Sequence, residues 1–169
     1  MTFMDIRGAV NGTTGYVEGA LVGKDVTVSL PEVAAALAEV QAMGTMEIPI
    51  IGILDAMEAS IKRIGVDMGL AKCCTPESKT YEFRWVQQVT KSDGKTSVEG
   101  CKAFIRGVPK IIFPGADIEP GATVETEIPL AVSRYQLFVG GKEVLCIDRL
   151  SQILRVNNVD YYGNIKNLL

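Results

Sequence analysis

The sequence predicts a mostly β protein with one or two short helices, and three observations lead to this fold class. Residues 81–90 and 98–107 each alternate apolar and polar side chains around an Asp-Gly turn, which is typical of a β-hairpin. Residues 123–139 form a longer alternating stretch, and a Gly-Gly pair follows it as a second turn. The C-terminal part, in contrast, contains only two candidate helical turns.

The chain of 169 residues fits one domain, which we expect to span residues 1–169. Its residues are 47% hydrophobic and only 22% charged, which is apolar for a soluble monomer. The net charge of −3 is unevenly distributed, since residues 1–60 sum to −6, residues 61–110 to +5 and residues 111–169 to −2. Such charges are either neutralised within the fold or orient copies of the protein against one another.

The composition excludes several classes of enzyme and binding protein. The chain contains no histidine, the residue that most often acts as a general base and as a metal ligand. Its net charge does not suit a protein that binds nucleic acid by neutralising phosphates. There is no convergent acid–base pair, phosphate-binding loop or metal-ligand spacing, so we expect no enzymatic activity, no cofactor and no metal site.

The four cysteines, Cys73, Cys74, Cys101 and Cys146, indicate small buried side chains rather than a redox or metal site. The adjacent pair lacks the two-residue spacer of such motifs, and no signal peptide is visible, so we expect reduced thiols. The longest apolar stretch, residues 48–54, is far shorter than the ~20 residues that a membrane helix needs. We therefore expect no membrane anchor.

The N-terminal half contains two segments whose local patterns favour helices. Residues 31–41 are rich in alanine and follow Ser29, a residue suited to an N-cap. In residues 54–64 apolar side chains recur at helical spacing, although residues 57–62 also alternate as in a strand. Residues 67–74 end before a Thr-Pro step and predict one or two turns of helix packed on a sheet.

The strand patterns assign side chains to faces. In the hairpin we expect the core-facing side chains to be Tyr81, Phe83, Trp85, Val89, Cys101, Ala103 and Ile105. In residues 123–139 the apolar face runs from Val124 to Val132, and Tyr135 falls on the opposite face. Pro129 lies within this stretch and is tolerable only at a sheet edge or a bulge, because it has no N–H to donate.

Several motifs stand in a characteristic order along most of the chain: Val26–Val33, Gly52–Ile61, Phe104–Gly115, Ala131–Asp148, Arg155–Tyr162 and a C-terminal Asn-Leu-Leu. In this order they resemble the major tail tube protein of contractile-tailed bacteriophages and of the related R-type phage-tail-like bacteriocins. The most specific part of the resemblance is the run from Arg106-Gly107 through Pro114-Gly115 to Ile147-Asp148.

The resemblance implies a structural protein with a β-sandwich or barrel-like tail tube fold. Six copies would form a hexameric ring with a continuous inner β-barrel, and rings would stack into a rigid tube for DNA passage or cell puncture. The implied partners are further copies of the chain, the tail sheath, baseplate and tail terminator proteins, and the tape measure protein or DNA in the lumen. The implied location is the virion or an extracellular tail-like particle, after assembly in the cytoplasm of the bacterial host.

The resemblance also conflicts with the local helical patterns. It implies that residues 26–40 and 54–64 are two long strands joined by an extended loop at about 41–53. Pairing across subunits can outweigh the few tenths of a kcal/mol per residue that helix propensity supplies. The alanine-rich residues 34–38 depart from the polar composition expected of a channel-facing strand.

Two groups of residues are candidates for the functional surfaces of such a tube. The apolar side chains of the loop, Met43, Met46, Ile48, Ile50 and Ile51, are candidates for axial stacking between subunits; the alternative is that the loop folds back onto its own core. The acidic side chains Glu32, Glu39 and Glu58 are candidates for the lumen, where carboxylates would repel DNA phosphates. Their alternative is ordinary solvated carboxylates.

Two other functions stay open from the sequence. A type VI secretion-like hexameric tube protein that carries effectors would share the superfamily, although the run from Phe104 to Asp148 favours the phage type. A small-molecule-binding β-barrel is a more remote alternative, because no constellation of side chains in the sequence supports a ligand site.

Overall fold

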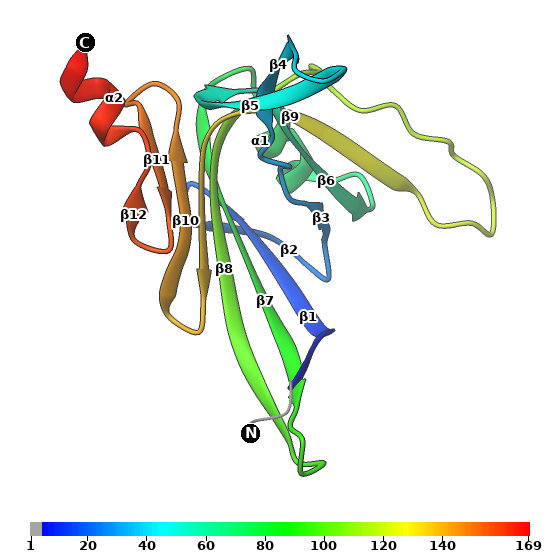
Figure 1. Cartoon of the computed structure of the whole chain (residues 1–169). Coiled ribbons are helices and arrows are strands. Elements are labelled where there is room, and N and C mark those ends of the chain that lie inside the picture. The colour runs from blue at the N-terminus through cyan, green and yellow to red at the C-terminus, as the bar shows by residue number, and fades with distance from the viewer. Residues whose placement is uncertain (1–4) are drawn as a thin grey trace.

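The structure is a computed structural model that describes residues 5–169, and β-strands make up most of it (Figure 1). A single domain is expected over residues 1–169, and residues 1–4 of it lie outside the described part of the chain. The strands of the main sheet, in spatial order, are β12 (Val159–Asp160), β11 (Ile153–Val156), β10 (Lys142–Asp148), β9 (Glu125–Val139), β8 (Thr96–Pro109), β7 (Lys79–Thr90), β1 (Ile6–Val17) and β2 (Ala20–Lys24).

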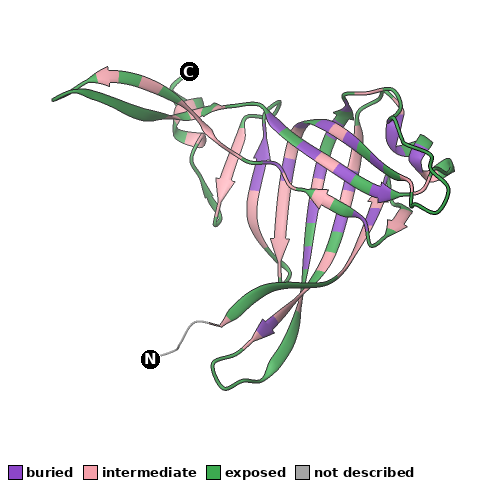
Figure 2. Cartoon of the chain, turned by 90° about the vertical axis from the view of Figure 1, so that its right-hand side faces the viewer, coloured by how far each residue is buried: buried purple, intermediate pink, exposed green. Residues whose placement is uncertain are grey.

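Strand β9 is where the sheet divides. Residues 125–132 of β9 pair with β6 (Met57–Ile64), residues 134–139 pair with β10, and β8 pairs with residues 130–139. Because β8 occupies one edge of β9, β6 and β10 both lie along the other edge. Strand β6 in turn pairs with β3 (Thr27–Ser29). The sheet folds over at β9, and the curvature is visible in Figure 2.

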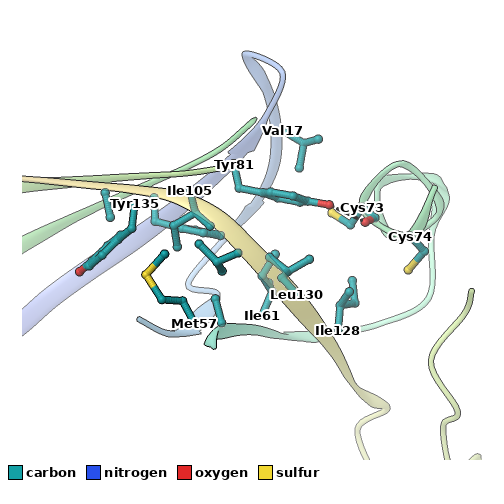
Figure 3. Close-up of a cluster of buried hydrophobic side chains, with 14 of the residues drawn as sticks. Val17, Met57, Ile61, Cys73, Cys74, Tyr81, Ile105, Ile128, Leu130 and Tyr135 are labelled. Atoms are coloured by element: carbon teal, nitrogen blue, oxygen red, sulfur yellow. Dashed lines mark hydrogen bonds between the residues drawn. The ribbon is translucent and has the colours of Figure 1, made fainter. Parts of the chain in front are cut away.

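The core lies between the β6–β9 layer and strands β7 and β8 (Figure 3). Met57, Ala59 and Ile61 of β6 and Ile128 and Leu130 of β9 pack in one cluster with the buried side chains of β7 and β8. The cluster residues of these two strands are Tyr81, Phe83, Ala103 and Ile105. The mostly β sandwich or barrel-like fold predicted for the chain is therefore confirmed.

Helix α1 (Met68–Cys74) closes one end of this core. Asp67 is its N-cap and accepts a hydrogen bond from the Leu70 N–H at 3.0 Å, which is the usual device for an exposed first turn. The Tyr81 hydroxyl donates to the Cys73 carbonyl at 2.9 Å and ties the helix to β7. The helix expected at residues 67–74 is confirmed. A second short helix, α2 (Gly163–Leu168), follows β12, and neither helix described in residues 5–169 is long and apolar enough to span a membrane.

The β7–β8 hairpin also agrees with the sequence prediction. The two strands pair in continuous register from Lys79↔Gly107 to Thr90↔Thr96. In the turn, Gly94 has a φ of +81°, and the Asp93 carboxylate accepts from the Lys95 N–H at 3.0 Å.

The helices that local patterns favoured at residues 31–41 and 54–64 are wrong. The structure has β4 (Ala35–Gln41) and β6 in these places, as the resemblance implied, although residues 30–34 and 55–56 interrupt the strands. Strand β6 shares an eight-residue ladder with β9 and buries every second side chain. This non-local pairing and burial outweigh the small intrinsic preference for helix.

An extended loop is expected at about 41–53, and the structure places a two-stranded ribbon there. Most of this segment is a strand, β5 (Thr45–Leu54), which pairs with β4 and with no other strand in the described part of the chain. Gly44 with a φ of +115° permits a tight reversal directly after β4. The β-branched residues of 45–54 then continue as an extended ribbon.

Two expectations for residues 123–139 have different outcomes. Tyr135 was expected on the polar face but is buried, because the register shifts between Arg106↔Arg134 and Gly107↔Val132 and leaves Ser133 as an extra residue. Pro129 is placed as expected. Its carbonyl accepts from the Lys110 N–H just beyond β8, so its missing N–H faces the edge where β8 has ended.

Candidate functional site

Strands β4 and β5 form a two-stranded ribbon that projects from the core, and we call residues 35–54 the arm (Figure 2). The tip is a short turn in which the Ala42 N–H donates to the Gly44 carbonyl at 2.8 Å. A two-stranded ribbon is marginally stable alone and usually needs a packed face. The arm is therefore a candidate for contact with another molecule.

Toward its tip the arm has one apolar face. Cross-strand pairing places Ala38 opposite Ile48 and Val40 opposite Met46, so these four side chains share a face, and Ile50 continues the alternation. Met46 retains 46% and Ile48 41% of their accessible surface. The opposite face carries the paired residues Leu37, Glu39, Gln41, Thr45, Glu47 and Pro49.

The five predicted stacking residues are all on the arm, but not all on this face. Met46, Ile48 and Ile50 belong to the apolar face. Met43 is fully exposed in the turn at the tip, and Ile51 is 66% exposed on the opposite side of β5 from Ile50. The alternative that this segment folds back onto the core does not hold for Met43 and Ile51.

The root of the arm is held by the C-terminal part of the chain. The Arg149 guanidinium donates to the carbonyls of Leu54 and Asp55 at 3.0 and 3.2 Å, where β5 turns into β6. Gly52 has a φ of +88°, and a Cβ there would come within 2.5 Å of the Tyr162 ring. These contacts fix the direction of the arm, and they are not readable from the sequence because they join residues about 100 positions apart.

The three predicted lumen residues do not gather in one place. Glu32 lies in the break between β3 and β4, so its assignment to a strand is wrong, because the β3 ladder with β6 ends at Ser29. Glu39 lies on the arm directly opposite Glu47. Glu58 is exposed on β6 and forms an ion pair with Lys110.

Glu58 shares the outward face of β3, β6 and the first half of β9 with other polar residues, and we call this surface the β6 face. Lys62 pairs with Glu127, and Ile64 pairs with Glu125. The polar members of the face are Thr27, Ser29, Glu58, Ser60, Lys62, Glu125 and Glu127. Carboxylates outnumber cations on this face. The alternation of residues 123–139 places Glu125 and Glu127 on the face opposite Val124, whereas their neighbours on β6 are not readable from the sequence.

The cysteines are buried and free, as expected. Burial raises the pKa of the Cys73 thiol to about 11 and also raises the pKa of Cys74, Cys101 and Cys146. Thiols in this state are poor nucleophiles at neutral pH. Within residues 5–169, no cluster of three or more His, Cys, Asp and Glu side chains is placed to hold a metal ion.

The fold was compared with solved structures of an extracellular contractile injection system, PVC. A chain of its sheath–tube complex in the extended state has a TM-score of 0.48 and 13% identity, covering 75% of this chain and 87% of the other. A chain of its sheath/tube terminator in the extended state has a TM-score of 0.50 and 11% identity, covering 76% and 94%. Because the identity is so low, the likeness to the terminator chain shows a similar fold.

Sequence comparison gives the family. No curated protein matches the chain significantly. The family model described as phage tail tube protein FII, however, matches residues 8–169, which include the arm, its root and the β6 face. The chain therefore belongs to the phage tail tube protein FII family.

Proposed function

We propose that six copies of this tail tube protein close into a ring, and that the rings stack into the rigid inner tube of a contractile tail or tail-like particle. Family membership supports the tube. The contractile setting is supported by the fold's likeness to a chain from a sheath/tube terminator of a contractile injection system. The proposal includes no catalytic step, in keeping with a chain that contains no histidine.

The proposal rests on the arm, because the rest of the chain does not cover its apolar face. Met46 and Ile48 remain more than 40% exposed, and their ribbon pairs with no other described strand. Apolar surface on a projecting ribbon marks an interaction site. We assign this face to a neighbouring copy in the next ring. Such a head-to-tail contact does not close on itself, so it produces a filament.

Ring closure requires lateral contacts, and open strand edges supply them. In the described residues β2 pairs only with β1, and β3 pairs only with β6. Residues 125–129 of β9 also lack a strand partner on the edge that β8 leaves. Joining the sheets of six copies around an axis would pair such edges, which otherwise invite aggregation.

The β6 face is our candidate for the lining of the bore. It presents Glu58, Glu125 and Glu127, and an excess of carboxylates would prevent DNA phosphates from adhering during transit. The proposed contents of the bore are the tape measure protein and DNA. The proposed outer and terminal partners are the sheath, the baseplate and the tail terminator, in a virion or an extracellular particle.

A triple substitution tests the stacking contact. Met46→Ser, Ile48→Ser and Ile50→Ser together remove the apolar face and should abolish tubes, while the circular dichroism spectrum and thermal unfolding of the subunit change little. A matched control replaces the opposite face by Glu39→Ser, Gln41→Ser and Glu47→Ser and should still form tubes. Electron microscopy and sedimentation measure both. Normal polymerisation of the first variant would reject the stacking role.

A further inference from the structure

The outward face of β7, β8 and β9 carries four cations, Arg84, Lys102, Arg106 and Arg134, and we call it the basic face. Arg84 lies directly opposite Lys102 across β7 and β8, and Arg106 lies directly opposite Arg134 across β8 and β9. Like charges in directly opposed positions destabilise a sheet. Two pairs of this kind on one face, with Phe104 between them on β8, are a cost to the isolated subunit, and an anionic partner would reduce it.

The carboxylates nearby leave most of this positive charge unneutralised. Glu82 pairs with Arg84 at 2.6 Å, and Glu143 pairs with Arg155 at 2.9 Å. Asp148 lies opposite Arg134 across β9 and β10, but its carboxylate accepts from the N–H groups of Leu150 and Ser151. Within residues 5–169, Lys102, Arg106 and Arg134 have no carboxylate within ion-pair distance.

The basic face also has a hollow that suits a side chain from another protein. Gly100 has no heavy atom within 4 Å of where a Cβ would stand, and the cavity beside it has a volume of about 460 Å³. Arg84, Lys102 and Phe138 line this cavity. The Phe138 ring is held edge-on to Phe104 at a centroid distance of 5.7 Å. A carboxylate entering here would meet two cations above an apolar wall.

We infer that the basic face is the surface on which the tube binds an acidic surface of the sheath protein. The inference rests on the proposed tube. In a ring of sandwiches joined at their edges, one outer face of each subunit points to the bore and the other points outward. The core lies between the β6 face and the basic face, so a bore lined by the β6 face puts the basic face outside. Copies in the same ring occupy the strand edges and copies in the next ring occupy the arm, which leaves the surrounding layer as the occupant of the basic face.

The test neutralises one member of each like-charged pair. Tubes carrying Lys102→Gln and Arg106→Gln are assembled in the presence of the purified sheath protein of the same tail and pelleted at increasing salt. We expect the sheath to bind about tenfold more weakly than to wild-type tubes, with a shallower dependence on salt. Thermal unfolding should occur at the same or a higher temperature, since repulsion is removed, whereas a purely structural role would lower it.

The control replaces two cations outside the face, Lys72→Gln and Lys166→Gln, and should leave sheath binding unchanged. Unchanged binding by the first variant, or an equal loss in the control, would overturn the inference. So would preferential binding of duplex DNA, added in place of the sheath, to wild-type tubes but not to the first variant. If the wild-type protein forms no tubes at all, the proposed function fails instead, so the two failures are distinguishable.

Discussion

At the scale of single residues, Arg63 and Asp67 form a charge pair at the start of α1. Arg63 is buried, its Nη2 donates to Asp67 at 2.6 Å, and its Nε and Nη1 have no hydrogen-bond partner in the described residues. The Leu70 N–H, and after it Arg63, lowers the pKa of Asp67, although desolvation opposes both. One carboxylate thus caps α1 and neutralises a buried guanidinium.

The lowered pKa of Asp67 gives a testable pH dependence. Its contribution to stability is fully present above the ordinary value of 3.8 and is lost as the pH falls through the lower value of the folded state. We expect Asp67→Asn to lower the free energy of unfolding by about 1 kcal/mol at pH 7, measured with urea. This difference should shrink toward pH 2. Asp117→Asn in the exposed 110–124 loop serves as the control; a difference for Asp67→Asn that does not vary with pH would contradict the assignment.

Two glycines of β8 give a matched pair of stability predictions. A Cβ on Gly107 would lie 2.6 Å from the Ala131 carbonyl oxygen, a backbone atom that cannot rotate away, beside the bulge at Ser133. Gly107→Ala should therefore cost about 1–3 kcal/mol. Gly100→Ala on the same strand meets no atom within 4 Å and should be within about 0.5 kcal/mol of wild type. Equal unfolding midpoints of the two variants in denaturant would show that the close approach of Gly107 to the Ala131 carbonyl does not restrict the residue at this position.

At the scale of elements, the root of the arm determines where the arm points. Arg149→Ala removes both donors to the carbonyls of Leu54 and Asp55, and the side chain that is lost is exposed. We expect faster amide hydrogen exchange in β4 and β5, fewer tubes, and a loss of less than about 1 kcal/mol in global stability. Hydrogen exchange with mass spectrometry measures this by segment. Unchanged exchange in residues 35–54 would show that Arg149 does not anchor the arm.

The elements that the sequence predicts correctly are those with local causes. The β7–β8 hairpin follows from alternation and an Asp-Gly turn within 30 residues, and α1 follows from its cap and the Thr-Pro stop. Strand β6 could not be predicted from local patterns, because its partner lies about 70 residues away in β9. Strand β4 pairs with the next strand, β5, but its alanine-rich composition favours helix. The position of Tyr135 depends on the bulge at Ser133, beside the close approach of Gly107 to β9, and this pairing of two strands is likewise not readable from a local pattern.

At the scale of the whole molecule, the sequence anticipates the candidate site only in part. The apolar composition of residues 43–51 pointed to the arm, and Met46, Ile48 and Ile50 do share one of its faces. The acidic candidates disperse, since Glu32 lies in the break at residues 30–34, Glu39 on the arm and Glu58 on the β6 face. The basic segment 61–110 supplies three of the four cations of the basic face, whereas the acidic segment 1–60 supplies only Glu58 to the β6 face, so the charge pattern of the sequence predicts the basic face better than the acidic one.

Assembly with several neighbours explains why the chain is apolar for its size. The subunit leaves large side chains exposed far from one another, among them Leu21 on β2, Leu37 on the arm and Ile112 in the loop after β8. Dispersed surfaces of this kind suit a subunit with lateral, axial and outer neighbours better than a free monomer.

Electron microscopy of the purified wild-type protein at high concentration tests the central claim most directly. Rings that stack head to tail should appear as hollow tubes of one uniform width and variable length. A monodisperse monomer that persists at all concentrations and salt conditions would contradict the account.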